Sequence, residues 1–274
     1  MRKLFVILFI LTGCLILLLN PKKTTEIILE PNPLIITLPN RLNVVAAKMY
    51  SERPRDVQLL NKSYSYFENG KFYNSVTGLV SDNTKKIIDI SSYQGTIDFS
   101  KVKEEVDGII LRIGFGTNLD SRLEEYITEL KDKKIPYGIY LYSYAENKIE
   151  ALNEAKFTEE IIKKYNLDPT LGVYYDIEEF YINGHKINIT KDTYQKIIET
   201  YINYLEDYQV SVYTYSKLYK YKLNEETKKY VTWIAQYNYT FNYQETYNMW
   251  QYTNSGKIDG INTNVDINVM FVKE

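Results

Sequence analysis

The sequence predicts an α/β barrel of eight strands in which helices follow only the first five strands. Between residues 85 and 229, five apolar strand-like runs are each followed by a stretch of helical periodicity, an alternation typical of parallel βα units. Three further strand-like runs follow with no room for long helices. Eight strands close naturally into a barrel like that of triosephosphate isomerase.

The elements follow one another in a regular order. The predicted strands are Ile87–Ser91, Gly108–Phe115, Tyr137–Tyr144, Gly172–Glu178, Val210–Tyr215, Val231–Tyr237, Met249–Thr253 and Val265–Phe271. The predicted helices are Phe99–Val106, Ser121–Lys133, Ile149–Tyr165, Asp192–Tyr208 and Lys217–Lys229. An open doubly wound sheet is the alternative. It usually has a glycine-rich phosphate loop after its first strand, and Ser91-Ser-Tyr-Gln-Gly95 is not one, so we favour the barrel.

Residues 1–23 have the pattern of a signal peptide or membrane anchor. After the basic Met1-Arg-Lys3, 16 residues carry no charge, and as a helix they span about 24 Å. Leu11-Thr-Gly-Cys14 is similar to a bacterial lipobox, so lipidation of Cys14 is the alternative to an uncleaved helix or an ordinary signal. Each interpretation predicts an extracytoplasmic protein, either secreted or anchored to the membrane.

Residues 24–84 are predicted to form a spacer before a catalytic barrel at 85–274. Four prolines interrupt its first part. Near its end, Asn69-Gly70 lies between two aromatic-rich runs, which is a strong signal for a β-hairpin.

Composition excludes several classes of protein. The 274 residues contain 33 Lys and Arg against 35 Asp and Glu, which gives no general signature of nucleic-acid binding. One cysteine excludes an internal disulfide framework. The 28 tyrosines suit a ligand that is apolar on one face and hydroxylated elsewhere, such as a sugar, although biased codon usage also explains them.

Acidic residues lie at the ends of three predicted strands, where the chemistry of such a barrel is found. Asp89 lies in the first strand, Asp176 and Glu178 in the fourth, and Asp266 in the last. Because strand residues alternate between faces, apolar neighbours turn toward the helices and the acids toward the lumen. First and last strands are neighbours in a closed barrel, so we expect all four acids at one mouth.

Clustered carboxyl groups have more than one use. Mutual repulsion raises at least one pKa, which keeps an acid protonated for general acid catalysis. Binding of magnesium or calcium is an alternative, and any single acid can instead cap a helix. An Asp176–Glu178 pair in an apolar strand is costly unless it is used. The single histidine, His185, lies in a predicted loop and supports neither a zinc site nor a catalytic triad.

Lumen-facing aromatic residues are candidates for binding a sugar ring. We expect Tyr142 and Trp233 to stack on sugars at the mouth, with Tyr140 beside them. Packing in the barrel core or against a helix is the alternative at each position. Arg112 is a further candidate for substrate binding, in which it would hold a carboxylate.

Six ordered motifs over about residues 86–272 resemble those of the family 25 glycoside hydrolases, the Chalaropsis-type lysozymes. The motifs are Asp89–Gly95 with Ile97-Asp-Phe99, Ile109–Gly116, Tyr137–Tyr144, Tyr175–Glu178, Trp233–Tyr237, and Trp250–Tyr252 leading to Val265–Asn268. Two positions depart from the family pattern. Phe99 stands where tryptophan is common, and Leu141 where histidine is common.

The resemblance implies a peptidoglycan hydrolase that cleaves the β-1,4 bond between N-acetylmuramic acid and N-acetylglucosamine. The resemblance assigns the role of catalytic acid/base to Glu178. It implies that Asp176 orients the substrate's N-acetyl group in a substrate-assisted, net-retaining route. Asp89 and Asp266 would shape the pocket, and Gln251, in a matching motif, is assigned to substrate binding. We expect a monomer that needs no metal or other cofactor.

Two other functions are alternatives to peptidoglycan hydrolysis. A chitinase-type barrel has four spaced acids, but Leu171 and Tyr174 occupy the first two of these positions here. A catalytically inactive peptidoglycan-binding module on a membrane tether remains the alternative, although the acids are intact.

Overall fold

The computed structural model describes residues 64–75, 77–237 and 247–272, together with four short strands before residue 40. The chain divides into two compact units, Met1–Lys62 and Ser63–Glu274. In the first unit, β1 (Phe9–Leu11) pairs with β2 (Cys14–Ile16), and β3 (Thr24–Leu29) pairs with β4 (Leu34–Pro39). Much of the predicted signal or anchor at 1–23 lies outside the described residues.

In the described part of the chain, no helix has both the length and the apolar character needed to cross a bilayer.

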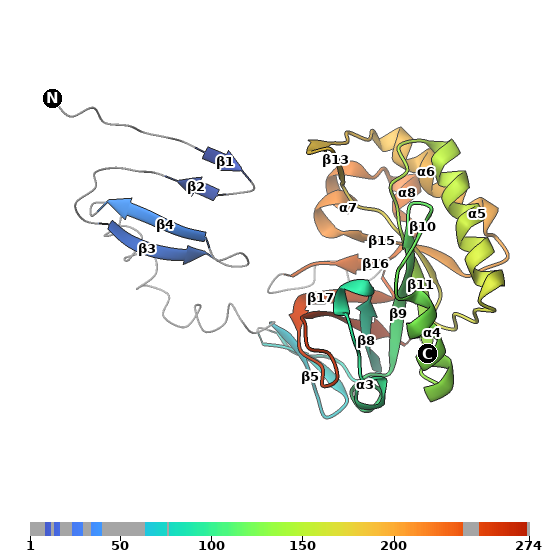
Figure 1. The fold of residues 1–274 in the computed structure, drawn as a ribbon, viewed down its shortest axis with the longest axis horizontal. Coiled ribbons are helices and arrows are strands. Elements are labelled where there is room, and N and C mark those ends of the chain that lie inside the picture. The colour runs from blue at the N-terminus through green and yellow to red at the C-terminus, as the bar shows by residue number, and fades with distance from the viewer. Residues whose placement is uncertain are drawn as a thin grey trace. The chain divides into compact units, whose positions relative to one another are not determined.

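The second unit contains a closed barrel of eight strands (Figure 1), as the sequence predicts. Their order is β9-β11-β12-β15-β16-β17-β18-β8, and β8 pairs with β9 to close the ring. The strands are β8 (Thr84–Ile90), β9 (Gly108–Phe115), β11 (Tyr137–Tyr142), β12 (Val173–Asp176), β15 (Val210–Tyr215), β16 (Val231–Ala235), β17 (Met249–Gly256) and β18 (Val265–Phe271).

Helices follow the first five barrel strands. They are η1 (Ser92–Gln94), α3 (Phe99–Glu105), α4 (Leu123–Lys133), α5 (Lys148–Lys164), α6 (Lys191–Tyr204), α7 (Ser216–Lys222) and α8 (Glu225–Lys228). Asp98, Asn147 and Thr190 cap α3, α5 and α6 by accepting backbone N–H groups. The single helix predicted at Lys217–Lys229 is wrong, because Asn224 caps a new helix there and so divides the segment.

The last strand runs against its neighbours. The pairings from β8 through β17 are parallel, whereas β18 is antiparallel to both β17 and β8. Only residues 257–264 connect β17 to β18, too few for the crossover that a parallel strand requires. In a fully parallel barrel, one mouth is formed by the C-terminal ends of all strands. Because β18 is antiparallel, Asp266 lies near the start of its strand.

The inner and outer faces of the barrel strands belong to two different apolar clusters. The smaller one fills the lumen with Tyr174, Tyr213, Trp233 and their neighbours. The larger one joins the outer strand faces, through residues such as Ile88 and Tyr175, to the surrounding helices. In Figure 1, α5 and α6 lie side by side along the outside of the barrel. The predicted alternation of strand faces is confirmed.

A three-stranded sheet precedes the barrel and packs against it. It consists of β5 (Ser65–Glu68), β6 (Lys71–Asn74) and β7 (Gly78–Ser81). The hairpin predicted at Asn69-Gly70 is confirmed, with both turn residues at positive φ, 51° and 73°. Phe72 packs its ring on Trp250 and Tyr252 of β17, at centroid distances of 5.7 and 5.1 Å.

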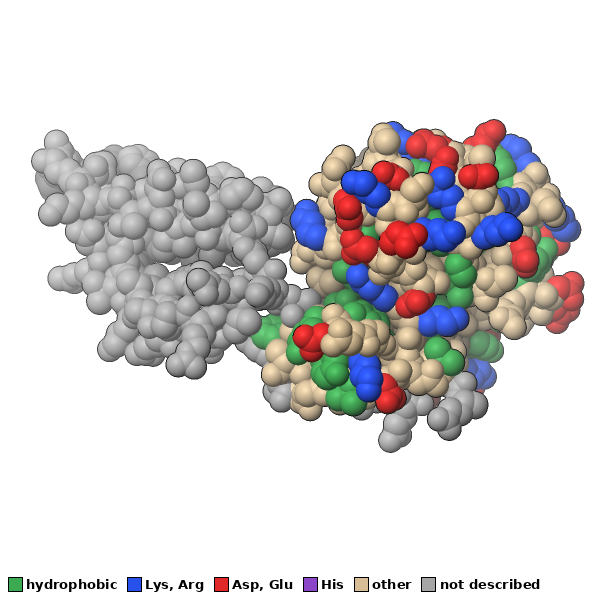
Figure 2. Space-filling view, turned by 90° about the horizontal axis from the view of Figure 1, so that it is seen from below, with side chains coloured by type: hydrophobic (Ala, Val, Ile, Leu, Met, Phe, Trp, Pro, Cys, Tyr) green, Lys and Arg blue, Asp and Glu red, His purple; other side chains and the backbone are tan. Residues whose placement is uncertain are grey.

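The surface of the barrel unit carries both signs of charge. Figure 2 shows Lys and Arg side chains mixed with Asp and Glu side chains over the visible face. Short ion pairs such as Lys163–Glu159 and Arg122–Glu125 join side chains of opposite charge in this unit.

Candidate active site

Asp89 and Asp266 face each other across the closing seam of the barrel. They are register partners on β8 and β18, and both side chains point to the lumen. Gln251 of β17 bridges them, because its Nε2 donates to Asp89 Oδ2 at 2.9 Å and to Asp266 Oδ2 at 3.3 Å. The predicted approach of the two acids is confirmed, and Gln251 is placed as their shared donor.

Asn268 is a second donor to the same oxygen of Asp89. Its Nδ2 donates to Asp89 Oδ2 at 2.8 Å, and its Oδ1 accepts the indole N–H of Trp233 at 2.7 Å. Asn268 lies two residues beyond Asp266 and therefore on the same lumen face of β18. Asp89 thus receives two side-chain amide donors, from Gln251 and Asn268.

Asp176 and Glu178 come from the end of β12. Asp176 is its last residue and pairs in register with Tyr142 of β11 and Tyr213 of β15. It is only 6% exposed, and its Oδ1 has no hydrogen-bond partner among the described residues. Glu178 lies two residues further on, beyond the end of the strand.

Burial dominates the electrostatics of the four acids. It raises the pKa of Asp89 to about 6, against the hydrogen bonds from Asn268 and Gln251. It also raises the pKa of Glu178 to about 7 and that of Asp266 to about 8. The pKa of Asp176 rises well above its ordinary value through burial and then through repulsion by Glu178, Asp89 and Asp266.

This arrangement can both hold and release protons near neutral pH. The charge of Asp89 raises the pKa of each of the other three acids, so all four carboxyl groups lie close together. A protonated carboxyl beside ionised ones supports general acid/base chemistry. In the described part of the chain, no group of three or more His, Cys, Asp or Glu residues is arranged to hold a metal ion.

Arg112 holds a carboxylate of this chain. Its Nε donates to Asp120 Oδ2 at 2.7 Å, and its Nη2 donates to Ser92 Oγ at 3.1 Å. The guanidinium also lies over the rings of Tyr93 and Phe115. This carboxylate is Asp120, brought next to Arg112 by the turn between β9 and β10 (Asn118–Leu119). Substrate binding by Arg112 stays a prediction.

Trp233 does not face a sugar-binding surface. It is 1% exposed and is enclosed by the rings of Tyr213, Tyr174 and Tyr140, at centroid distances of 4.4, 5.1 and 6.2 Å. The stacking expected for it is therefore wrong, because the residue lies deep in the lumen. Periodicity indicates the face of a strand but not the depth within the barrel.

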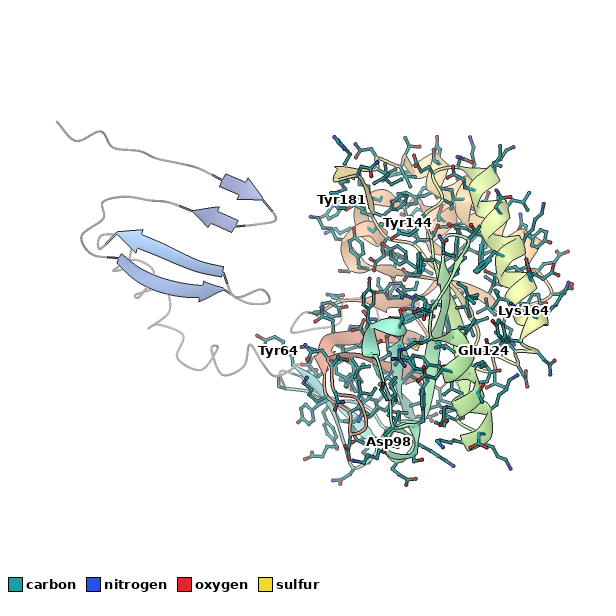
Figure 3. The ribbon with its side chains drawn as sticks, viewed as in Figure 1. Tyr64, Asp98, Glu124, Tyr144, Lys164 and Tyr181 are labelled. Carbon is teal, nitrogen blue, oxygen red and sulfur yellow. The ribbon has the colours of Figure 1, made fainter. Side chains whose placement is uncertain are left out.

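Tyr142 and Tyr144 lie nearer the opening. Tyr142 is half-buried, with its ring in edge contact with Tyr144, and its hydroxyl is affected by the charges of Glu178 and Asp176. Tyr144 is 41% exposed, and Figure 3 labels it together with Tyr181. Tyr140 is packed deeper, against Trp233.

Sequence reasoning missed Asn268 and Asp120. The alternation in β18 that singled out Asp266 also places Asn268 on the lumen face, so that signal was present. Asp120 gave no such signal, because it lies outside the strands and reaches Arg112 only through a tight turn.

Residues 88–261 match the family described as Glycosyl hydrolases family 25. The chain belongs to this family. Its similarity to a curated relative, the autolytic lysozyme of Clostridium acetobutylicum, is 31% identity over 185 residues, covering 66% of this chain and 54% of that protein.

Solved structures extend the comparison for this family 25 chain. The modular autolysin LytC from Streptococcus pneumoniae, also solved in complex with a synthetic peptidoglycan ligand, superimposes with a TM-score of 0.70 and 37% identity over 77% of this chain and 52% of LytC. The catalytic domain of the endolysin ply40, from bacteriophage P40 of Listeria monocytogenes, superimposes with a TM-score of 0.59 and 27% sequence identity. This match covers 70% of this chain and 95% of the ply40 domain. This chain spans about half the length of the lysozyme and of LytC.

Proposed function

We propose that this chain is a lysozyme-type peptidoglycan hydrolase that cleaves the β-1,4 bond from N-acetylmuramic acid to N-acetylglucosamine. The observation that carries the proposal is the meeting of Asp89, Asp176, Glu178 and Asp266 at one mouth of the barrel. Membership of family 25 supports it, as does similarity to an autolysin solved with a peptidoglycan ligand.

Glu178 acts as the general acid and then as the general base. A pKa near 7 lets it hold a proton at neutral pH and release it readily. As the bond from the muramic acid C1 to the bridging oxygen breaks, Glu178 protonates that oxygen, which leaves as the 4-hydroxyl of N-acetylglucosamine. Glu178 later takes a proton from the water that attacks C1.

Asp176 orients the substrate's own nucleophile. The acetamido oxygen of N-acetylmuramic acid attacks C1, and water then opens the cyclic intermediate, so the configuration at C1 is retained. The buried Asp176 Oδ1 is free of partners among the described residues and can accept the acetamido N–H. Asp89, ionised near neutral pH, stabilises the positive charge that develops at C1, and Asp266 contributes to the hydrogen bonding of the pocket. No step in this route uses a metal or another cofactor.

The site of action is outside the cytoplasmic membrane. The basic and then uncharged pattern of residues 1–23 supports export, with an N-terminal helix, a lipid on Cys14 or a cleaved signal as the means. Peptidoglycan, the proposed substrate, lies in the same compartment.

The test compares two adjacent glutamates in the full-length protein. Glu178→Gln should lower the rate of peptidoglycan hydrolysis at least about 100-fold, because the amide cannot donate or take the proton. Glu179→Gln is the matched control, since Glu179 pairs with Lys186 at 2.8 Å and faces a different partner. Turbidity loss and mass spectrometry of the products would measure both.

Three outcomes would contradict the proposal or its assignment of Glu178. New reducing ends at N-acetylglucosamine would identify a different bond specificity. A wild-type protein that sediments with peptidoglycan but releases no reducing ends would be the inactive binding module. Equal rates in wild type and Glu178→Gln would remove Glu178 from the acid/base role.

A further inference from the structure

Trp233 determines the orientation of a neighbouring amide. An indole N–H can only donate a hydrogen bond, so the oxygen of Asn268, and not its nitrogen, must face Trp233 at 2.7 Å. The Asn268 Nδ2 is then directed at Asp89 Oδ2, at 2.8 Å, and at the carbonyl oxygen of Ile87, at 3.3 Å. Every hydrogen-bonding atom of this buried amide has a partner.

Gln251, the other amide on Asp89, lacks such a constraint. Its Oε1 accepts from the hydroxyls of Tyr213 and Tyr237, and its Nε2 donates to Asp89. A tyrosine hydroxyl and a protonated carboxyl can each donate or accept, so the orientation of this amide depends on the protonation of its partners Asp89 and Asp266. Of the two amides, only Asn268 is oriented by a neighbour that cannot reverse its role.

Packing prevents Trp233 from turning away. Its ring is enclosed by tyrosines from three neighbouring strands, and close-packed interiors hold side chains in single rotamers. The indole N–H therefore stays directed at Asn268. A buried donor left without an acceptor would also cost free energy, which holds the pair together.

We propose that Trp233 and Asn268 form a positioning pair that always presents a hydrogen-bond donor to Asp89. The pair favours the ionised form of Asp89 next to three other acids. Its value for catalysis rests on the hydrolase function proposed above, in which an anionic Asp89 stabilises positive charge at C1. Trp233 thus acts through Asn268 and does not touch the substrate.

Asp89 titrates among other charged and titratable groups. Those that face it or its neighbouring acids are Asp176, Glu178, Asp266, Arg112, Tyr140, Tyr142, Tyr213, Tyr215 and Tyr237. Burial raises the pKa of Asp89 to about 6, and the bonds from Asn268 and Gln251 oppose that rise. Weakening the hydrogen bond from Asn268 should therefore raise the pKa of Asp89 further.

The test replaces each of the two tryptophans by phenylalanine in the full-length protein. Trp233→Phe keeps an aromatic ring but removes the N–H that orients Asn268. Trp250→Phe is the matched control, because Trp250 is equally buried and its Nε1 donates at 2.8 Å to the carbonyl oxygen of Gln236, away from the acids. Carbon-13 NMR of the aspartate carboxyl groups, with Asp89→Asn to identify the resonance, measures the titration of Asp89.

We expect the Asp89 midpoint to rise by about 0.5–1 pH unit in Trp233→Phe and to stay in place in Trp250→Phe. An unchanged midpoint in Trp233→Phe, or equal changes in both variants, would overturn the proposal. If Trp233→Phe does not fold, Asn268→Leu carries the same expectation, since it removes the amide at similar volume. If the wild type proves inactive, the hydrolase proposal fails, but the NMR titration still decides this inference.

The same pair should affect the pH profile of hydrolysis. If anionic Asp89 assists the reaction, the acid limb of kcat/KM should move upward with the NMR midpoint in Trp233→Phe but not in Trp250→Phe. A loss of rate at every pH with no movement of the limb would indicate a structural role alone.

Discussion

Like charges placed opposite each other on neighbouring strands destabilise a sheet, and Asp89 and Asp266 occupy such positions. The barrel tolerates them because burial favours the protonated forms and because Gln251 donates to both. The folded protein therefore binds protons that the unfolded chain releases near pH 4. Stability contributed by this protonation is present at low pH and is lost as the pH rises toward the folded pKa values.

This linkage predicts that Asp266→Asn becomes stabilising as the pH rises. The pKa of Asp266 is about 8 when folded, against 3.8 ordinarily, so the wild type pays a free-energy penalty that grows between about pH 4 and 8. At pH 8 the free energy of unfolding of the variant should exceed that of the wild type by about 1–3 kcal/mol. At pH 4 the two values should be nearly equal. Urea denaturation at both values of pH measures this.

A surface aspartate supplies the comparison for that measurement. Asp132→Asn removes an exposed carboxylate at the end of α4 and should change stability by less than about 0.5 kcal/mol at either pH. An Asp266→Asn variant that is less stable than wild type at pH 8 would contradict the linkage argument.

Among the helices, α5 contributes a buried acid that serves no proposed chemical step. Glu154 is 3% exposed and accepts hydrogen bonds from Ser143 Oγ at 2.9 Å, from the Tyr144 backbone N–H at 2.8 Å and from the Tyr175 hydroxyl. Burial raises its pKa. Through these bonds α5 holds both the segment after β11, which carries Tyr144, and the outer face of β12.

Removing this carboxylate should destabilise the fold markedly. Glu154→Ala removes the shared acceptor of three donors, of which only Ser143 Oγ keeps another acceptor, the Tyr175 hydroxyl at 2.9 Å. The loss should lower the free energy of unfolding by about 2–4 kcal/mol. Glu160→Ala, on the exposed face of the same helix, should change it by less than about 0.5 kcal/mol. Thermal and urea denaturation compare the two, and equal losses would show that Glu154 is no more than a helix-surface residue.

At the scale of the whole molecule, the β5–β7 sheet belongs to the same compact unit as the barrel. The fully buried Phe72 joins the two through Trp250 and Tyr252. Phe72→Ala should therefore lower the free energy of unfolding of the barrel unit by about 3–5 kcal/mol, through lost burial and a residual cavity.

The same sheet offers a control for this prediction. Leu79 on β7 is half exposed, so Leu79→Ala should have a much smaller effect on the urea midpoint. If Phe72→Ala unfolds at the same urea concentration as wild type, the sheet is only loosely attached to the barrel.

Much of this fold could be predicted from local patterns. Alternation between apolar and acidic residues, as in Ile88-Asp89-Ile90, assigns strand faces, and the rhythm of strands and helices assigns the barrel. The direction of β18 could have been argued from the short 257–264 connection, which excludes a parallel crossover. The gathering of the four acids followed from strand order alone.

The remaining features depend on three-dimensional packing that local patterns do not contain. Trp233 and Tyr142 both face the lumen, but only their depth separates a core residue from one near the opening. The partner of Arg112 depends on a tight turn, and the Asn268 bond to Asp89 depends on the register of two strands far apart in sequence. Such contacts form only when the barrel is closed.

Closure between β8 and β18 joins residues separated by most of the barrel sequence. During synthesis, Asp89 leaves the ribosome long before Asp266 and Asn268, so a nascent chain carries Glu178 without the strand that completes the surroundings of Asp89. Pairings of such long range form late and slowly. The cluster of acids is therefore complete only after the final strand has been translated and has paired with β8.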